Sequence, residues 1–106
     1  MQQIQPAQLA NWLETGPAPL LLDVREAWEA AIGQIEGSLH VPMHQVPVRL
    51  AELLGADRPI ICYCHHGMRS MQVAMFLEHH GAGTVYNLVG GIDAWARLVD
   101  PGCPRY

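Results

Sequence analysis

The sequence predicts an α/β protein with a mainly parallel sheet and helices on both of its faces. First, short apolar runs alternate with amphipathic segments from one end of the chain to the other. Second, residues 20–24 are apolar apart from Asp23, which is typical of a strand covered on both faces. Third, eight prolines and ten glycines among 106 residues indicate short elements joined by tight turns. We therefore expect a small sheet of about five strands.

The expected elements follow from where apolar runs begin and where glycine or proline interrupts them. Pro6 suits the first turn of a helix, and Leu9 and Trp12 would then share one face. The helix that follows Cys64 is apolar on two sides, which predicts that it is sandwiched between other elements. All of residues 1–106 are expected to form one domain. In chain order we expect an extended start at 1–5, a helix over 7–15, a strand over 20–24, a helix over 25–31, a strand over 38–41, a helix over 46–54, a strand over 59–63, a helix over 68–80, a strand over 84–88, a helix over 92–98 and an irregular tail from about residue 99.

The composition argues against several classes of partner. The formal charge is −4, with ten acidic residues, six arginines and no lysine. An acidic chain without basic runs is a poor ligand for nucleic acid or for an anionic membrane. No apolar run approaches the length of a membrane span, and residues 1–20 lack the features of a signal peptide. Three cysteines make a disulfide framework improbable, so we expect a cytoplasmic protein.

The most informative segment is 64–70, which reads Cys-His-His-Gly-Met-Arg-Ser. It lies between a predicted strand and a predicted helix, at the carboxyl end of the strand, where sites form in open α/β sheets. The first N–H groups of a helix lack internal partners, and with the helix dipole they attract anions. We expect a thiol held there to ionise more easily than a free one. Cys64 is therefore the candidate nucleophile.

The other residues of this loop, from His65 to Ser70, are expected to bind the substrate. Gly67 lets the backbone turn. Arg69 can either bind a substrate anion or pair with a neighbouring carboxylate, and Ser70 can cap the helix or offer its hydroxyl to the substrate. His66 and Met68 could rim the pocket and contact an acceptor.

Together with three further segments, the motif Cys64-x-x-Gly67-x-Arg69-Ser70 resembles the active-site loop of the rhodanese family. The further segments are Leu-Leu-Asp-Val-Arg at 21–25, Gly-Gln-Ile-Glu-Gly-Ser at 33–38 and Leu-Val-Gly-Gly-Ile-Asp-Ala-Trp at 88–95. They occur in the family's order over nearly the whole chain, which fits the single-domain form. Gln34 departs from the histidine that the family often has, at a position that belongs to the framework.

This resemblance implies a rhodanese-like α/β fold and a sulfurtransferase that moves sulfane sulfur through a Cys64 persulfide by a ping-pong mechanism. The donor would be thiosulfate or another small anionic sulfur donor, including a persulfide. The acceptor would be cyanide, a thiol or a protein cysteine, and no metal or organic cofactor is needed. His65 and His66 stand at loop positions that vary in the family, so the acceptor is not fixed. Five residues are expected to support the loop: Asp23 and Arg25 as a hydrogen-bonded pair, Gly90 and Gly91 by allowing close backbone approach, and Trp95 by packing.

Three alternatives stay open on the sequence alone. A phosphatase would use five residues between cysteine and arginine, whereas four separate Cys64 from Arg69. A metal site could draw on Cys62, Cys64, His65 and His66, but their spacing is unlike that of common zinc sites. A binding module without activity would not need the cysteine. Cys62 is expected in the core and Cys103 as a free thiol in the tail, although either could relay sulfur.

Overall fold

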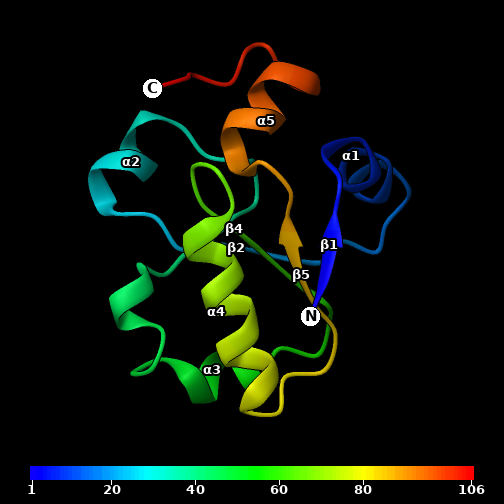
Figure 1. Cartoon of the computed structure of the whole chain (residues 1–106). Coiled ribbons are helices and arrows are strands. Elements are labelled where there is room, and N and C mark those ends of the chain that lie inside the picture. The colour runs from blue at the N-terminus through cyan, green and yellow to red at the C-terminus, as the bar shows by residue number, and fades with distance from the viewer.

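Five parallel strands form one sheet in the order β1-β5-β4-β2-β3, and helices cover both of its faces (Figure 1). The computed structural model describes residues 1–106. The α/β fold with about five parallel strands, predicted from the sequence, is confirmed. The elements are β1 (Gln2–Ile4), α1 (Pro6–Thr15), β2 (Leu20–Asp23), α2 (Ala27–Ile32), β3 (Leu39–His40), the 3-10 turn η1 (Met43–Gln45), α3 (Leu50–Leu54), β4 (Ile60–Tyr63), α4 (Met68–His79), β5 (Val85–Leu88) and α5 (Gly91–Leu98).

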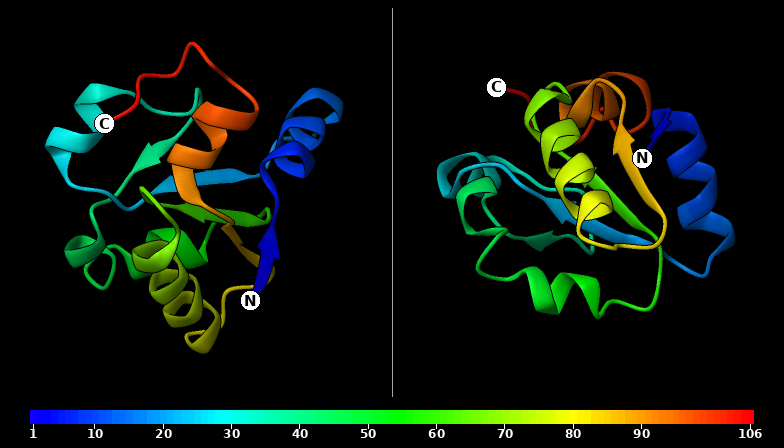
Figure 2. Two further views of the ribbon diagram at one scale, coloured as in Figure 1. Left: turned by 45° about the horizontal axis from the view of Figure 1, so that its top comes forward. Right: turned by 60° about the horizontal axis from the view of Figure 1, so that its bottom comes forward.

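The sheet separates two apolar clusters, and the alternation along β4 explains how. Ile60 and Cys62 pack into the cluster that contains Val73 of α4 and Leu53 of α3, together with Cys64. Ile61 and Tyr63 point to the other side, where α1 and α5 supply Leu9, Ile92 and Trp95. Helices α1 and α5 therefore lie on the opposite face of the sheet from α3 and α4 (Figure 2). Strands such as β4 carry apolar side chains on both sides because helices cover both faces of the sheet.

Two expectations about the helices are wrong. The helix expected over 46–54 begins only at Leu50, because residues 43–49 form successive three-residue turns and Pro47 has no N–H to donate. Helix α4 is not sandwiched: Val73, Ala74 and Leu77 are buried, whereas Met75 is 56% exposed. The side of α4 that carries Met75 therefore faces solvent.

The carboxyl ends of β2, β4 and β5 meet at one edge of the sheet, and the segments that follow them gather there. These segments are helix α2, the loop after β4 and helix α5. Residues 99–106, which carry no helix or strand, run from α5 across to α2 (Figures 1 and 2). No helix in the structure has the length and apolar character needed to span a lipid bilayer.

Candidate active site

Three hydrogen-bond donors converge on the sulfur of Cys64. Cys64 follows the last residue of β4 and is 1% exposed. The backbone N–H groups of Gly67 and Ser70 lie 3.1 and 3.4 Å from its Sγ, and the Ser70 hydroxyl lies 3.3 Å away. We call the backbone of residues 64–70, together with this sulfur, the cup. Because N–H groups stabilise an anion and not a neutral thiol, the cup is suited to a thiolate or a persulfide anion.

Helix α5 fixes the direction of the cup's peptide groups. Its first free N–H groups, those of Ile92 and Asp93, donate to the carbonyl oxygens of Cys64 and His65 at 2.9 and 3.1 Å. These carbonyls are therefore engaged by α5. A Cβ at Gly91, whose φ is +61°, would overlap both carbonyl oxygens, so only glycine lets α5 approach this closely.

The side chain of Asn87, in β5, forms hydrogen bonds with two residues of the cup and was not identified from the sequence. Its Nδ2 donates to the carbonyl oxygen of Gly67 at 3.1 Å, and its Oδ1 accepts from the Ser70 hydroxyl at 2.5 Å. The Ser70 hydroxyl has one proton, so it donates either to Asn87 or to Cys64 at any moment. Ser70 does not cap the helix, because α4 begins at Met68 with Gly67 as its N-cap. The available signal was a polar side chain within the apolar run of β5.

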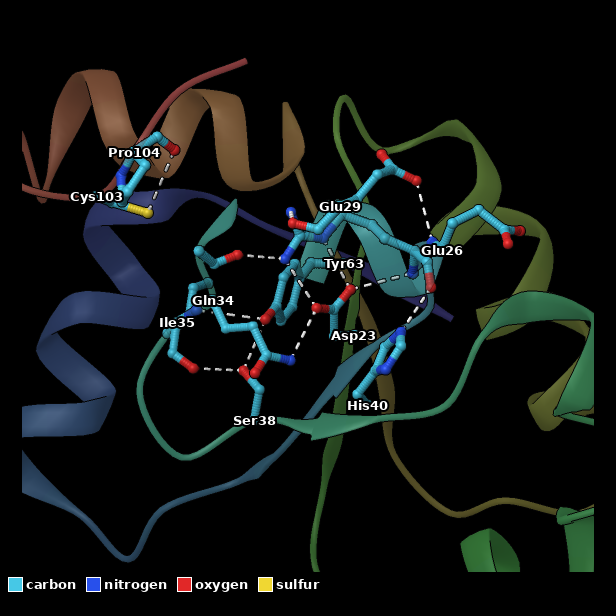
Figure 3. A network of polar contacts seen from close by, with 12 residues as sticks. Asp23, Glu26, Glu29, Gln34, Ile35, Ser38, His40, Tyr63, Cys103 and Pro104 are labelled. Atoms are coloured by element: carbon cyan, nitrogen blue, oxygen red, sulfur yellow. Dashed lines mark hydrogen bonds and ion pairs between the residues drawn. The ribbon is translucent and has the colours of Figure 1, made fainter. Parts of the chain in front are cut away.

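Asp23 and Arg25 form an ion pair in which both side chains are fully buried. The Arg25 Nε and Nη2 donate to the two Asp23 oxygens at 2.9 and 2.8 Å, and the amide of Gln34 donates to Asp23 at 3.0 Å. Figure 3 shows Asp23 beside Gln34, with Tyr63 next to them. Arg25 also donates to the carbonyl oxygens of Glu29 and Gly33, which ties α2 to the sheet. The pair is thus part of the framework on which the cup sits.

Arg69 pairs with Glu29 of α2. Of the two roles expected for Arg69, binding a substrate anion or pairing with a carboxylate, the structure shows the second. Its Nη1 and Nη2 donate to the two Glu29 oxygens at 2.7 and 2.9 Å. The hydrogen bonds from Arg69 lower the pKa of Glu29 to about 2, despite the burial that opposes this shift. The Tyr106 hydroxyl also donates to Glu29, at 2.7 Å. Neither Glu29 nor Tyr106 was identified from the sequence, because each meets the loop only through the fold.

Three aromatic rings stack on one another beside the cup. The His65 ring stacks between His66 and Tyr106, with centroid distances of 4.1 and 4.0 Å. Burial, followed by the nearby His66, lowers the pKa of His65, which favours its neutral form. Trp28 packs edge-on against Tyr106 and is 63% exposed, so it lies at the surface and not in the core. Met68 in the loop is exposed as well.

The remaining sequence candidates lie away from the sulfur. Trp95 is buried with the α1 and α5 side chains, and Gly90 begins the turn into α5 with a φ of +74°. Cys62 and Cys103 are buried free thiols. Burial raises the pKa of each of them, which disfavours the reactive thiolate at both positions.

The cluster closest to a metal-ligand set differs from the one considered from the sequence. Ligand atoms of His65, His66 and Asp93 lie within 4.8 Å of one another, whereas Cys62 is in the core. Asp93 also accepts hydrogen bonds from Arg97 and Arg105, both at 3.3 Å. Two guanidinium groups on one carboxylate oppose the approach of a third cation.

Comparisons with known proteins agree with this geometry. Residues 5–98 match the family model of the rhodanese-like domain. A sulfurtransferase of Allochromatium vinosum is 40% identical over 97 residues, covering 92% of this chain and 90% of the relative. A thiosulfate sulfurtransferase of Haemophilus influenzae is 33% identical over 100 residues, covering 94% and 92%. The crystal structure of a rhodanese-like domain protein from Staphylococcus aureus superposes with a TM-score of 0.85 at 29% identity, covering 100% and 99%.

Proposed function

The chain belongs to the rhodanese family, whose members include sulfurtransferases, and we propose that Cys64 is the residue on which it carries the transferred sulfur. The observation that supports this most strongly is the convergence of the Gly67 and Ser70 N–H groups and the Ser70 hydroxyl on one sulfur atom. No such set of donors is directed at Cys62 or Cys103.

In the first step the Cys64 thiolate attacks the outer sulfur of the donor. With thiosulfate, a bond forms between the Cys64 sulfur and this outer sulfur, and the bond from the outer sulfur to the sulfonate sulfur breaks. Sulfite leaves with the electron pair, and Cys64 becomes a persulfide anion. The N–H groups of the cup would offset its negative charge, because they are fixed in place before the reaction.

In the second step a nucleophilic acceptor attacks the terminal sulfur of the persulfide. The acceptor would be cyanide, a thiolate or a protein cysteine. The sulfur–sulfur bond on Cys64 breaks, the acceptor leaves with the sulfur, and the Cys64 thiolate returns. This is a ping-pong cycle with a covalent intermediate. We expect it to need no metal or organic cofactor, because the thiolate is both nucleophile and leaving group.

The same geometry argues against a phosphatase. A phosphoryl group has several charged oxygens and is usually bound by an arginine fork. In this protein both terminal nitrogens of Arg69 are already bound to Glu29. The four-residue spacing from Cys64 to Arg69 points in the same direction.

The mass of the protein after treatment with a sulfur donor tests the proposal. We expect wild-type protein to gain one sulfur atom and Cys64→Ser to gain none and to lose sulfur transfer. Cys103→Ala is the matched control, since it removes a different buried thiol, and we expect it to load sulfur normally. Sulfur found only on Cys62 or Cys103 would contradict the proposal.

A further inference from the structure

The side-chain amide of Asn87 is held in a single orientation beneath the cup. Its nitrogen, Nδ2, lies 3.1 Å from the carbonyl oxygen of Gly67 and 3.1 Å from the Oε1 of Gln3. A backbone carbonyl oxygen accepts hydrogen bonds and cannot donate them, so the atom that faces Gly67 must be the amide nitrogen. The amide oxygen of Asn87 therefore faces Ser70, and the Ser70 hydroxyl is its hydrogen-bond donor.

This orientation decides how the hydroxyl of Ser70 is used. The Ser70 Oγ and the Asn87 Oδ1 lie 2.5 Å apart, and an amide oxygen only accepts, so Ser70 must donate to Asn87. The same Oγ lies 3.3 Å from the Sγ of Cys64. One hydroxyl proton cannot serve both acceptors at once, so the Asn87 oxygen and the Cys64 sulfur compete for it.

The protonation state of Cys64 determines which acceptor takes the hydroxyl proton. As a thiol, Cys64 can donate its S–H to Ser70 while Ser70 donates to Asn87, so that each group has a partner. When Cys64 releases its proton to solvent, the thiolate attracts the hydroxyl more strongly than a neutral amide does, because hydrogen bonds to charged groups are stronger. The hydroxyl then turns toward the sulfur, and the amide oxygen of Asn87 loses its donor.

Burial makes the loss of this donor costly. Cys64, Ser70 and Asn87 are 1%, 0% and 3% exposed, so water has little access to the unpaired amide oxygen. A buried acceptor without a donor is unfavourable. The stabilisation that the Ser70 hydroxyl gives to the thiolate is therefore reduced by the hydrogen bond that Asn87 gives up.

We propose that Asn87 is a positioning residue of this site, which competes with Cys64 for the hydroxyl proton of Ser70 and thereby limits the fraction of Cys64 that is thiolate. This inference rests on the proposed function, in which the thiolate is the nucleophile. After a sulfur atom has been transferred, the negative charge lies on the terminal sulfur of the persulfide. The Cys64 Sγ is then a weak acceptor, and the hydroxyl returns to Asn87. The proton stays on the Ser70 oxygen throughout, and only the direction of the O–H bond changes.

The rate at which iodoacetamide alkylates Cys64 tests this competition, because only the thiolate reacts. The rate is measured over the pH range in which it rises in proportion to the thiolate fraction, and peptide mass analysis confirms that Cys64 is the alkylated residue. Asn87→Leu has a similar volume and removes the competing oxygen. We expect its effect on the rate to be about fivefold more accelerating with Ser70 present than in a Ser70→Ala background, which corresponds to about 1 kcal/mol.

The Ser70→Ala background separates the two contacts of Asn87. Asn87→Leu also removes the hydrogen bond to Gly67, and that loss is the same in both backgrounds. Asn11→Leu is the matched control, because Asn11 is the other asparagine of the chain and is exposed in α1, and we expect no change in the rate. The titratable and charged groups around Cys64 are kept in every variant: Cys62, His65, Arg69, Glu29 and Asp93.

A measurement on the wild-type protein decides the matter even if Asn87→Leu does not fold. Because Asn11 and Asn87 are the two asparagines, asparagine labelled at its side-chain carbonyl carbon gives two NMR signals. We expect the Asn87 signal to shift with pH at the same midpoint as the alkylation of Cys64, since the carbonyl loses its hydrogen bond from Ser70. The shift should become much smaller in Ser70→Ala, and the Asn11 signal should stay constant.

Equal effects of Asn87→Leu in the two backgrounds would overturn the inference, because they would assign the role of Asn87 to the Gly67 carbonyl alone. An Asn87 signal that does not move while Cys64 ionises would overturn it as well. Both results leave the proposed function intact, because alkylation requires no sulfur donor. Failure of Cys64 to gain sulfur in the mass measurement would instead contradict the proposed function, whatever the alkylation rates are.

Discussion

Two arginine–carboxylate ion pairs lie near the cup, and they differ in burial and in structural role. In the Asp23–Arg25 pair both side chains are fully buried. In the Glu29–Arg69 pair the glutamate is 4% exposed and the arginine 37%. The hydroxyl of Tyr106 joins them, since it accepts from Arg25 at 3.1 Å and donates to Glu29 at 2.7 Å.

The first pair belongs to the framework of the fold, and the second belongs to the loop. Arg25 donates hydrogen bonds to Asp23, to Tyr106 and to backbone carbonyl oxygens. The Asp23–Arg25 pair therefore holds α2 against the sheet. Arg69 belongs to the loop itself, and its two hydrogen bonds to Glu29 tie the loop to α2. A change in the first pair should therefore act on stability through the framework, whereas a change in the second should act on stability through the loop that follows β4.

The largest effect is expected from Asp23→Ala, which leaves Arg25 buried without a charge partner. Breaking such a pair costs about 3–5 kcal/mol, and we expect a fall of that size in the free energy of unfolding measured with urea. Glu52→Ala is the control, because it breaks an exposed pair with Arg49 and should leave the midpoint unchanged. Equal effects of the two substitutions would contradict the framework role of Asp23.

Glu29→Gln is expected to have an intermediate effect that depends on pH. The pKa of Glu29 is lowered to about 2 from its usual 4.5, so the folded state gains stability from the ionised carboxylate above pH 4.5. This gain disappears as pH falls from 4.5 toward 2. We expect wild type to exceed the variant by about 2 kcal/mol at pH 7, a value reduced because exposed Arg69 is partly screened. Urea unfolding at several pH values should show this difference shrinking toward zero near pH 2. A constant difference would mean that the charge is not its source.

The smallest effect is expected from Tyr106→Phe, which removes the hydroxyl between the two pairs and keeps the ring on His65. The hydroxyl makes two hydrogen bonds, one with Arg25 and one with Glu29, but both charged groups keep their other partners. We therefore expect a loss of about 1–1.5 kcal/mol in the free energy of unfolding, measured by thermal unfolding. Tyr86→Phe is the control, because its hydroxyl has no hydrogen-bond partner within the protein and its ring also packs on an aromatic neighbour, Trp12. A larger loss in the control would contradict the bridging role of Tyr106.

The sequence predicted the features that depend on neighbouring residues. The strand before Cys64, the glycine turn at Gly67 and the pair Asp23–Arg25 all arise within a few positions of the chain. The helix boundary that was wrong lies before α3, where Pro42 and Pro47 precede the helix. There the local hydrogen bonds of the three-residue turns compete with a continuous helix.

The residues that were missed reach the cup over long stretches of chain. Glu29 lies 40 positions from Arg69, and Tyr106 lies 77 positions from Glu29. No spacing rule links such residues, because the order of the strands in the sheet decides whether they meet. Asn87 belongs to the same group, since it lies under the loop only because β5 pairs with β4.

The central claim is that Cys64 carries the sulfur in a competent intermediate. In the most direct test, wild-type protein is loaded from thiosulfate that carries an isotopic label on its outer sulfur, and the remaining thiosulfate is removed. Peptide mass analysis then locates the label before and after an acceptor thiol is added. We expect the label on Cys64, and we expect it to pass to the acceptor at least as fast as the steady-state turnover. Label on Cys62 or Cys103, or label that stays on Cys64 while turnover proceeds, would contradict the claim.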